Sequence, residues 1–195
     1  NLSRRVFSSI DGKKNTVVYK QLQPVEHVLL RPDTYIGSTV PAEDTMWIYG
    51  KGRMFRRPCT FSPGLLKIVD EILVNAADNK ERDERMTEIR VDIDRDSGSI
   101  SVWNDGRGLP IERLSIDKTM TSSEYVPSLV FGSLYTSSNY DDNQVKTVGG
   151  RNGFGAKLAN IFSTEFYVRT ASSESDLVFE QRRYGGHDHL DDIDL

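Results

Sequence analysis

The alternation of hydrophobic and polar residues divides the chain into a polar N-terminal arm and a series of helices and strands. Residues 1–22 are polar and lack a helical period, so we expect an arm rather than part of the core. Pro24 suits a first helical turn, and that helix must end at Arg31, because a residue that precedes a proline is pushed out of the helical region. Residues 45–49 and 54–61 are short aromatic-rich runs that predict strands.

A long helix and a hairpin follow. The spacing of apolar residues predicts one helix from Pro63 to near Asp83. Its expected apolar stripe consists of Leu66, Val69, Leu73, Ala76 and Ala77. Residues 89–93 and 100–102 then alternate on either side of a turn at 94–98, which predicts a β-hairpin.

The C-terminal part mixes the same elements. Residues 125–134 are typical of a helix, and the glycine-dense stretch 149–155 opens another helix through Ala159 and Ile161. Residues 164–170 and 177–181 predict a second hairpin. This order indicates the α+β class, in which helices interrupt a mostly antiparallel sheet.

Composition and charge narrow the possible roles. A length of 195 residues suits one domain, or one domain plus an arm. The single cysteine excludes an internal disulfide and favours a reducing compartment. We find no apolar run near 18 residues and no signal-peptide pattern, so we expect no membrane association. The net charge of −4 disfavours this domain as the main holder of DNA, since phosphate contacts need clustered Lys and Arg.

The long helix carries the first candidate site. Glu71, Asn75, Asp78 and Asn79 are spaced so that they share one helical face, roughly opposite the Leu73 side. Such a face is often only solvated. Two asparagines and two acids, however, are poor helix formers and good ligands for Mg²⁺ and water, which favours a functional interpretation.

A second candidate lies at the end of the first hairpin. Asn104 is in phase with Ile100 and Val102, so its side chain should point to the buried side of the sheet and need a partner. The edge of an adenine ring, with one donor and one acceptor, would suit this amide. Gly106 and Gly108 would let the backbone approach a flat ring closely. Taken alone, the same residues are more typical of a simple turn.

The third candidate is the glycine loop 149–157. Four glycines in seven residues before a helix predict a concavity of backbone N–H groups that could cradle phosphates, with Lys157 in the first turn. The loop matches neither a Walker A motif nor a dinucleotide fingerprint, and a flexible loop without a ligand stays possible. The polar run 136–140 could contact ribose or phosphate oxygens but, without context, is more typical of a turn.

The order of these motifs resembles the Bergerat-fold (GHKL) ATPases. The segments 71–79, 103–108 and 149–157 carry the resemblance. That superfamily includes gyrase-type topoisomerases, a class of chaperones, mismatch-repair proteins and sensor histidine kinases. The finer strings at 30–37, at 136–140 and at Gly149-Gly150-Arg151-Asn152-Gly153 look like the N-terminal ATPase domain of eukaryotic type IIA DNA topoisomerases, over roughly residues 19–181.

The resemblance implies a fold and a domain organisation. The expected fold is a two-layer α/β sandwich with a mixed, mostly antiparallel sheet covered by helices on one face. Residues 1–22 would be an N-terminal arm that straps the dimer, and residues 23–195 an incomplete ATP-binding domain. Because the family's transducer and DNA-cleavage domains are not evident, we expect ATP binding with weak hydrolysis.

The resemblance also implies a role for each matching residue. Glu71 would activate the attacking water, and Asn75 would coordinate Mg²⁺. Bacterial gyrases have an adenine-binding aspartate at the position of Asn104, so the asparagine in this chain would contact adenine partly indirectly. Tyr19 would reach the partner subunit's nucleotide. The further ATP-binding positions would be Asn79, Ser137, Ser138, Asn139, Gly150, Arg151, Asn152, Gly153, Phe154, Gly155, Ala156 and Lys157.

The implied partners are a second subunit and duplex DNA. ATP with Mg²⁺ would drive dimerisation of the N-terminal gate for strand passage in the nucleus, although a mitochondrial form stays open. One alternative is a Bergerat-fold chaperone or mismatch-repair ATPase, against which the strings at 30–37 and 136–140 argue. Another is a non-catalytic nucleotide sensor, which the presence of Glu71 disfavours.

Overall fold

The computed structural model describes residues 21–115, 123–134, 154–185 and 189–194. The arm expected over residues 1–22 and the glycine loop before Phe154 lie almost wholly outside these ranges. Within the described ranges, no helix is long and apolar enough to cross a membrane.

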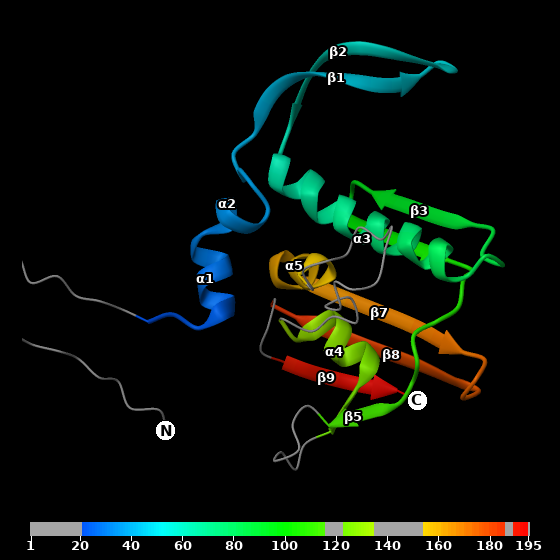
Figure 1. Ribbon diagram of the computed structural model, residues 1–195. Helices are drawn as coiled ribbons and strands as arrows, with labels where there is room; N and C mark the ends of the chain where they lie inside the picture. The colour runs from blue at the N-terminus through cyan, green and yellow to red at the C-terminus, as the bar shows by residue number, and fades with distance from the viewer. Residues whose placement is uncertain (1–20, 116–122, 135–153, 186–188, 195) are drawn as a thin grey trace, which may run out of the picture.

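Helices and strands alternate along the described chain (Figure 1). The helices are α1 (Pro24–Leu30), α2 (Pro32–Tyr35), α3 (Pro63–Arg82), α4 (Val126–Gly132) and α5 (Gly155–Phe162). The strands are β1 (Ala42–Gly50), β2 (Arg53–Phe61), β3 (Ile89–Asp94), β4 (Ser99–Asn104), β5 (Arg113–Ser115), β6 (Ser123–Tyr125), β7 (Glu165–Ser172), β8 (Leu177–Tyr184) and β9 (His189–Asp194). These bounds confirm the predicted helices at Pro24 and Pro63 and both predicted hairpins.

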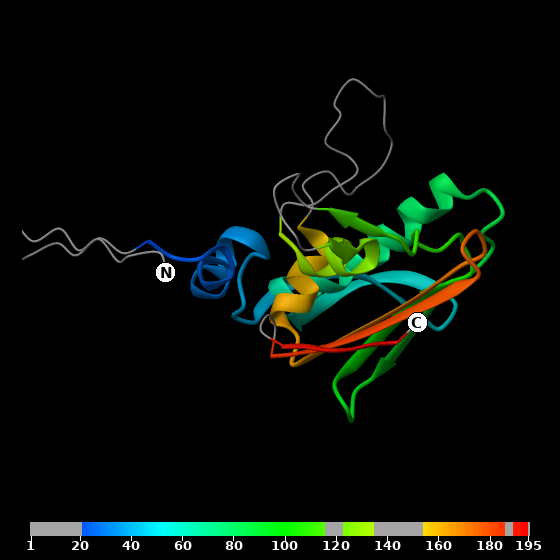
Figure 2. The same ribbon diagram turned by 90° about the horizontal axis from the view of Figure 1, so that it is seen from below.

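Every strand pairing in the described residues is antiparallel. The strands form three separate hairpins, β1–β2, β3–β4 and β5–β6, and a three-stranded sheet in the order β7–β8–β9. Figure 2 shows α4 and α5 on one face of the β7–β8–β9 sheet. The α+β class with antiparallel strands and helices on one face is therefore confirmed.

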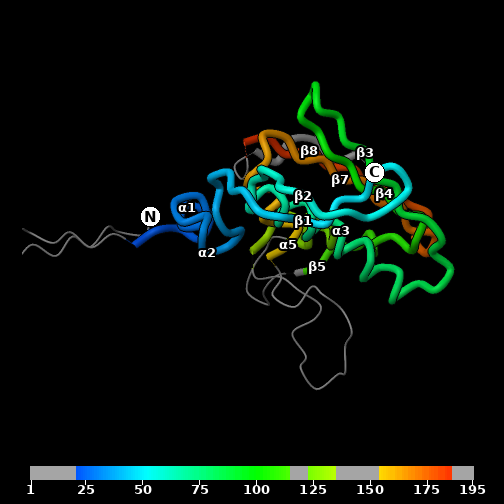
Figure 3. Tube along the Cα trace, turned by 90° about the horizontal axis from the view of Figure 1, so that it is seen from above, coloured from blue at the N-terminus to red at the C-terminus, as the bar shows by residue number. Residues whose placement is uncertain are grey.

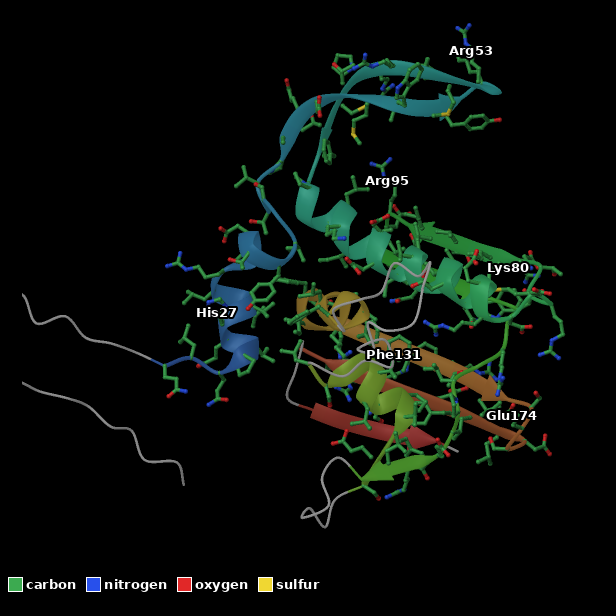
Figure 4. The ribbon with its side chains drawn as sticks, in the orientation of Figure 1. His27, Arg53, Lys80, Arg95, Phe131 and Glu174 are labelled. Atoms are coloured by element: carbon green, nitrogen blue, oxygen red, sulfur yellow. The ribbon has the colours of Figure 1, made fainter. Side chains whose placement is uncertain are left out.

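The β1–β2 hairpin lies apart from the remaining elements in Figure 1, and Figure 3, seen from above, shows it passing over α3. Its pairing runs without interruption from Ala42 opposite Phe61 to Gly50 opposite Arg53. Lys51 and Gly52 form the turn with φ angles of 52° and 76°, the left-handed values that a tight two-residue hairpin turn needs. Arg53 therefore lies at the far tip of the hairpin (Figure 4).

The main hydrophobic core joins the N-terminal helices to α5. Val28 of α1, Ile36 after α2, and Leu158 and Ile161 of α5 form one buried cluster, against which Ile68 of α3 packs. Such a cluster stabilises mainly by removing apolar area from water. It places the first turn of α5 beside the middle of α3.

The predicted apolar stripe of α3 is only partly correct. Ala76 is buried, but Leu66 is 48% exposed and Ala77 is also exposed. Asp78, which we predicted on the polar face, is buried. Part of the polar side of α3 meets other elements: Glu71 lies against Gly155 of α5, and Asn79 bonds to Asn104 of β4, whereas Asn75 is exposed. Polar helix residues that meet other elements in this way indicate a site rather than a fully solvated face.

Candidate functional site

Two elements, β4 and α5, meet the polar side of α3. The helix begins at Pro63, the first-turn position that suits proline, and the Ser62 hydroxyl accepts a hydrogen bond from the Leu65 amide at 3.4 Å. Asn104 at the end of β4 bonds to Asn79 in the C-terminal half of α3, and Gly155 of α5 lies against Glu71 near its middle. Figure 1 shows α5 lying beside α3. The candidate residues Glu71, Asn79 and Asn104 all lie where these elements meet α3.

Glu71 lies where α3 meets the start of α5. Its side chain is 21% exposed, and its Oε1 is 2.5 Å from the Lys67 Nζ one helical turn earlier. A Cβ atom added to Gly155 would lie 2.3 Å from the Glu71 Oε2. The carboxylate therefore fills the space that any larger residue at position 155 would need, which explains the glycine there.

Asn75 and Asp78 occupy different environments, although we predicted them on one face. The side chain of Asn75 is exposed, so its amide oxygen is open to a ligand from solution. Asp78 is buried, at 5% exposure. Asn75 therefore suits the predicted contact to a metal ion, and Asp78 lies deeper.

Asn79 and Asn104 form an amide pair that joins α3 to β4. The Asn79 Nδ2 donates to the Asn104 Oδ1 at 2.9 Å and to the Arg107 carbonyl at 3.1 Å. The Gly106 amide also donates to the Asn104 Oδ1, at 3.2 Å. Both side chains are half-buried. The partner that we predicted for Asn104 is thus supplied in part by the protein itself, and its Oδ1 already accepts two hydrogen bonds.

Gly106 and Gly108 are needed because the backbone passes very close to neighbouring elements. A Cβ atom on Gly106 would lie 2.6 Å from the Asn79 Nδ2 and 2.9 Å from the Met86 Sδ. A Cβ atom on Gly108 would lie 1.8 Å from the Ala171 carbonyl oxygen of β7. We predicted close approach to a ligand, and the structure adds close approach to α3 and β7.

Two carboxylates that we did not assign hold this turn in place. Asp105 accepts hydrogen bonds from the Thr87 hydroxyl at 2.6 Å and from the Thr87 and Glu88 amides at 2.8 and 2.9 Å. These bonds, that of the Thr87 side chain above all, lower the pKa of Asp105 to about 2. Asp83 accepts from the Arg107 amide at 2.8 Å, and its hydrogen bond with Arg85 lowers its pKa. The turn chemistry of Asn-Asp-Gly was the sequence signal for Asp105.

The first turn of α5 contains the remaining described candidates. Lys157 is 4% exposed, and burial lowers its pKa to about 8. Ala156 is also buried, and the Phe154 ring is 5.9 Å from that of Tyr35, which anchors this turn to α2. The start of α5 is therefore fixed by packing on one side while it faces Glu71 on the other.

The other predicted positions cannot be placed. They lie outside the described residues and are Tyr19, Ser137, Ser138, Asn139, Gly150, Arg151, Asn152 and Gly153. Lys67, for which we predicted no role, contacts Glu71 directly. The signal for this contact in the sequence was the spacing of four residues on one helix.

The arrangement suits phosphoryl transfer with one metal ion that is bound mainly by the phosphates of the substrate. The helix N-terminus at Gly155 favours anionic oxygens, and Glu71 supplies one carboxylate beside it. The described residues contain no group of three His, Cys, Asp or Glu side chains that could form a metal cage. Mg²⁺ commonly uses few protein ligands together with phosphates and waters, so an exposed amide such as Asn75 fits it.

Comparison with known families gives a specific match. Residues 61–182 match the family described as histidine kinase-, DNA gyrase B-, and HSP90-like ATPase. These residues include α3, the β3–β4 hairpin, α5 and most of the β7–β8 hairpin, and so the elements α3, β4 and α5 that form the candidate site.

Individual relatives are similar over most of this chain. DNA topoisomerase 2 from Penicillium chrysogenum is 55% identical over 165 residues, which are 84% of this chain and 10% of that protein. DNA topoisomerase 2-alpha from Homo sapiens is 53% identical over 181 residues, which are 91% of this chain and 12% of that protein. The chain thus spans about a tenth of the length of these curated relatives.

Solved structures support the same grouping. The ATPase region of Saccharomyces cerevisiae topoisomerase II is similar with a TM-score of 0.84 and 46% identity, over 90% of this chain and 46% of that one. The ATPase and transducer domains of DNA topoisomerase II from Balamuthia mandrillaris give a TM-score of 0.83 and 49% identity, over 90% and 44% of the two chains.

Proposed function

Because this chain belongs to the histidine kinase-, DNA gyrase B- and HSP90-like ATPase family, we propose that it binds ATP with Mg²⁺ between α3 and the start of α5 and hydrolyses it. It is homologous to the ATPase region of type II DNA topoisomerases. The observation that carries the proposal is the contact of the Glu71 carboxylate with the first residue of α5, which brings a base to the end of a helix that favours phosphate.

The base of the nucleotide would lie at the Asn79–Asn104 end of the site and the phosphates at the Glu71 end. Asn104 would contact adenine through an amide that Asn79 holds in place. Lys157, in the first turn of α5, would neutralise phosphate charge. The phosphates and the base of the nucleotide would then follow the order of Glu71 and Asn79 along α3.

Hydrolysis would require the protein mainly to position the reacting groups and to neutralise the charge of the phosphates. Glu71 would accept a proton from water as the water oxygen attacks the γ-phosphorus, and the bond from that phosphorus to the ADP oxygen would break. Mg²⁺, held by Asn75 and the phosphates, would neutralise negative charge that develops on them. Residues Ser137, Ser138, Asn139 and 150–153 would complete the pocket.

We further propose that the chain acts within a larger nuclear type II topoisomerase. In that protein, ATP binding would drive two such domains together, with Tyr19 contacting the partner's nucleotide, so that one DNA duplex can pass through another. The net charge of −4 supports a division of labour in which other parts of the protein hold the DNA.

Calorimetric titration with a non-hydrolysable ATP analogue tests the site. We expect binding that depends on Mg²⁺ in the wild type and is lost in Asn75→Ala. Glu81→Ala, an exposed change on the same helix, should bind as the wild type does. Equal binding by Asn75→Ala with and without Mg²⁺ would remove Asn75 as a metal ligand, and absence of binding in every variant would refute the site.

A further inference from the structure

Lys67 and Glu71 form an ion pair in the order that stabilises a helix less. The Lys67 Nζ is 2.5 Å from the Glu71 Oε1 and 4.0 Å from the Asp70 Oδ2, so it pairs with Glu71 in preference to Asp70. In helices, a pair spaced by four residues stabilises more when the acid precedes the base, and here the base comes first. Exposed pairs of this kind also contribute little to stability, and Lys67 is 45% exposed.

The pair fixes one oxygen of a carboxylate whose other oxygen is already enclosed. The Glu71 Oε2 lies against Gly155, where even one additional carbon atom would overlap it. A glutamate side chain has three rotatable bonds, so contact at one oxygen alone would leave the carboxylate plane free to turn. With Lys67 on Oε1 and the start of α5 at Oε2, both the position and the plane of the carboxylate are restrained. The hydrogen bond to Glu71 also raises the pKa of Lys67, so Lys67 is an ammonium at neutral pH.

We infer that Lys67 is the positioning residue for Glu71, holding Oε1 so that Oε2 faces the start of α5, where the attacking water would lie. The inference rests on the proposed role of Glu71 as the base. Lys67 exchanges no proton in the reaction: the water proton passes to the Glu71 Oε2, the water oxygen bonds to the γ-phosphorus, and ADP leaves. Effective catalysis requires placement of such a group to within roughly 0.5 Å.

Single-turnover hydrolysis of radiolabelled ATP, with the protein in excess, measures the consequence. Lys67→Ala should lower the hydrolysis rate by about 10- to 100-fold, while the Kd of the Mg²⁺-loaded ATP analogue changes less than about threefold. Lys67→Arg should restore most of the rate, because its cation can reach the same carboxylate. Asp70→Asn is the matched control, since Asp70 is the other acid near Lys67, and it should hydrolyse at the wild-type rate.

A titration that does not depend on hydrolysis completes the test. The Lys67 side-chain carbon resonance, followed by NMR, should titrate above the ordinary lysine value of 10.5 in the wild type and in Asp70→Asn, and nearer to 10.5 in Glu71→Gln. A wild-type midpoint at or below 10.5 would overturn the inference.

The kinetic outcomes separate this inference from the proposed function. If Glu71→Gln hydrolyses ATP at the wild-type rate, the role of Glu71 fails and the role of Lys67 fails with it. If Glu71→Gln is inactive but Lys67→Ala is within about twofold of wild type, only the positioning role fails. A parallel loss of rate and affinity in Lys67→Ala would instead make Lys67 a nucleotide-binding residue, which also contradicts positioning.

Discussion

Gly155→Ala should impair hydrolysis without disturbing the fold. The φ angle of Gly155 is not in the left-handed region, so the backbone accepts alanine without strain. Gly155 is also the first residue of α5, where an alanine is compatible with the helix. We therefore expect a melting temperature close to that of the wild type.

The expected loss of activity follows from one distance. The new Cβ would lie 2.3 Å from the Glu71 Oε2, whereas ordinary contact begins near 3.4 Å, so the carboxylate must retreat by about 1 Å. Misplacement by 1 Å can cost a reaction about 100-fold in rate, which is about 2.7 kcal/mol of activation free energy. Nucleotide affinity should stay within a few-fold, because this carboxylate acts on the water rather than on the nucleotide.

A double-mutant cycle distinguishes this overlap from a general disturbance of α5. Single-turnover hydrolysis would be measured for Gly155→Ala, for Glu71→Asp and for both together. The shorter aspartate leaves room for the added methyl group, so Gly155→Ala should cost far less in the Glu71→Asp background than in the wild type. Equal costs in both backgrounds, or wild-type hydrolysis by Gly155→Ala, would refute the reasoning.

Three further predictions concern pH and stability. Burial lowers the pKa of Lys157 to about 8, so affinity for the ATP analogue should be full below pH 8 and fall above it, and Lys157→Arg should remove this dependence in calorimetry. Asp105 has its pKa lowered to about 2 from 3.8, so its contribution to stability is complete above pH 4 and is lost as pH falls towards 2; urea unfolding should show the gap between wild type and Asp105→Asn closing over that range. Phe179 is fully buried, so Phe179→Ala should lower the free energy of unfolding by about 3–5 kcal/mol in the same assay.

Much of the local structure follows from short-range pattern alone. The proline at position 24 and the period of α3 predict helices that the structure contains, and strict alternation around residues 94–98 predicts the β3–β4 hairpin. These predictions succeed because capping, turn formation and periodicity depend on residues only a few positions apart. The candidate residues of α3 and β4 were likewise evident, since their chemistry is unusual for the elements that carry them.

The side of α3 that faces inward could not be read from its own residues. Leu66 and Ala77 continue the apolar period, yet both are exposed, whereas the acid Asp78 is buried. Burial depends on which elements pack against a helix, and here α5 and the end of β4 contact Glu71 and Asn79 of its polar side. An apolar period therefore indicates a helix more reliably than it indicates the buried face.

The sequence by itself determined the elements, the family resemblance and the types of residue available for the chemistry. Only the tertiary structure decided which of them meet: Asn79 with Asn104 across 25 residues, and Glu71 with Gly155 across 84. Contacts between such distant positions depend on how helices and strands pack, which no local period encodes. The same packing turned the glycines at 106, 108 and 155 from permissive turn residues into positions where a side chain has no room.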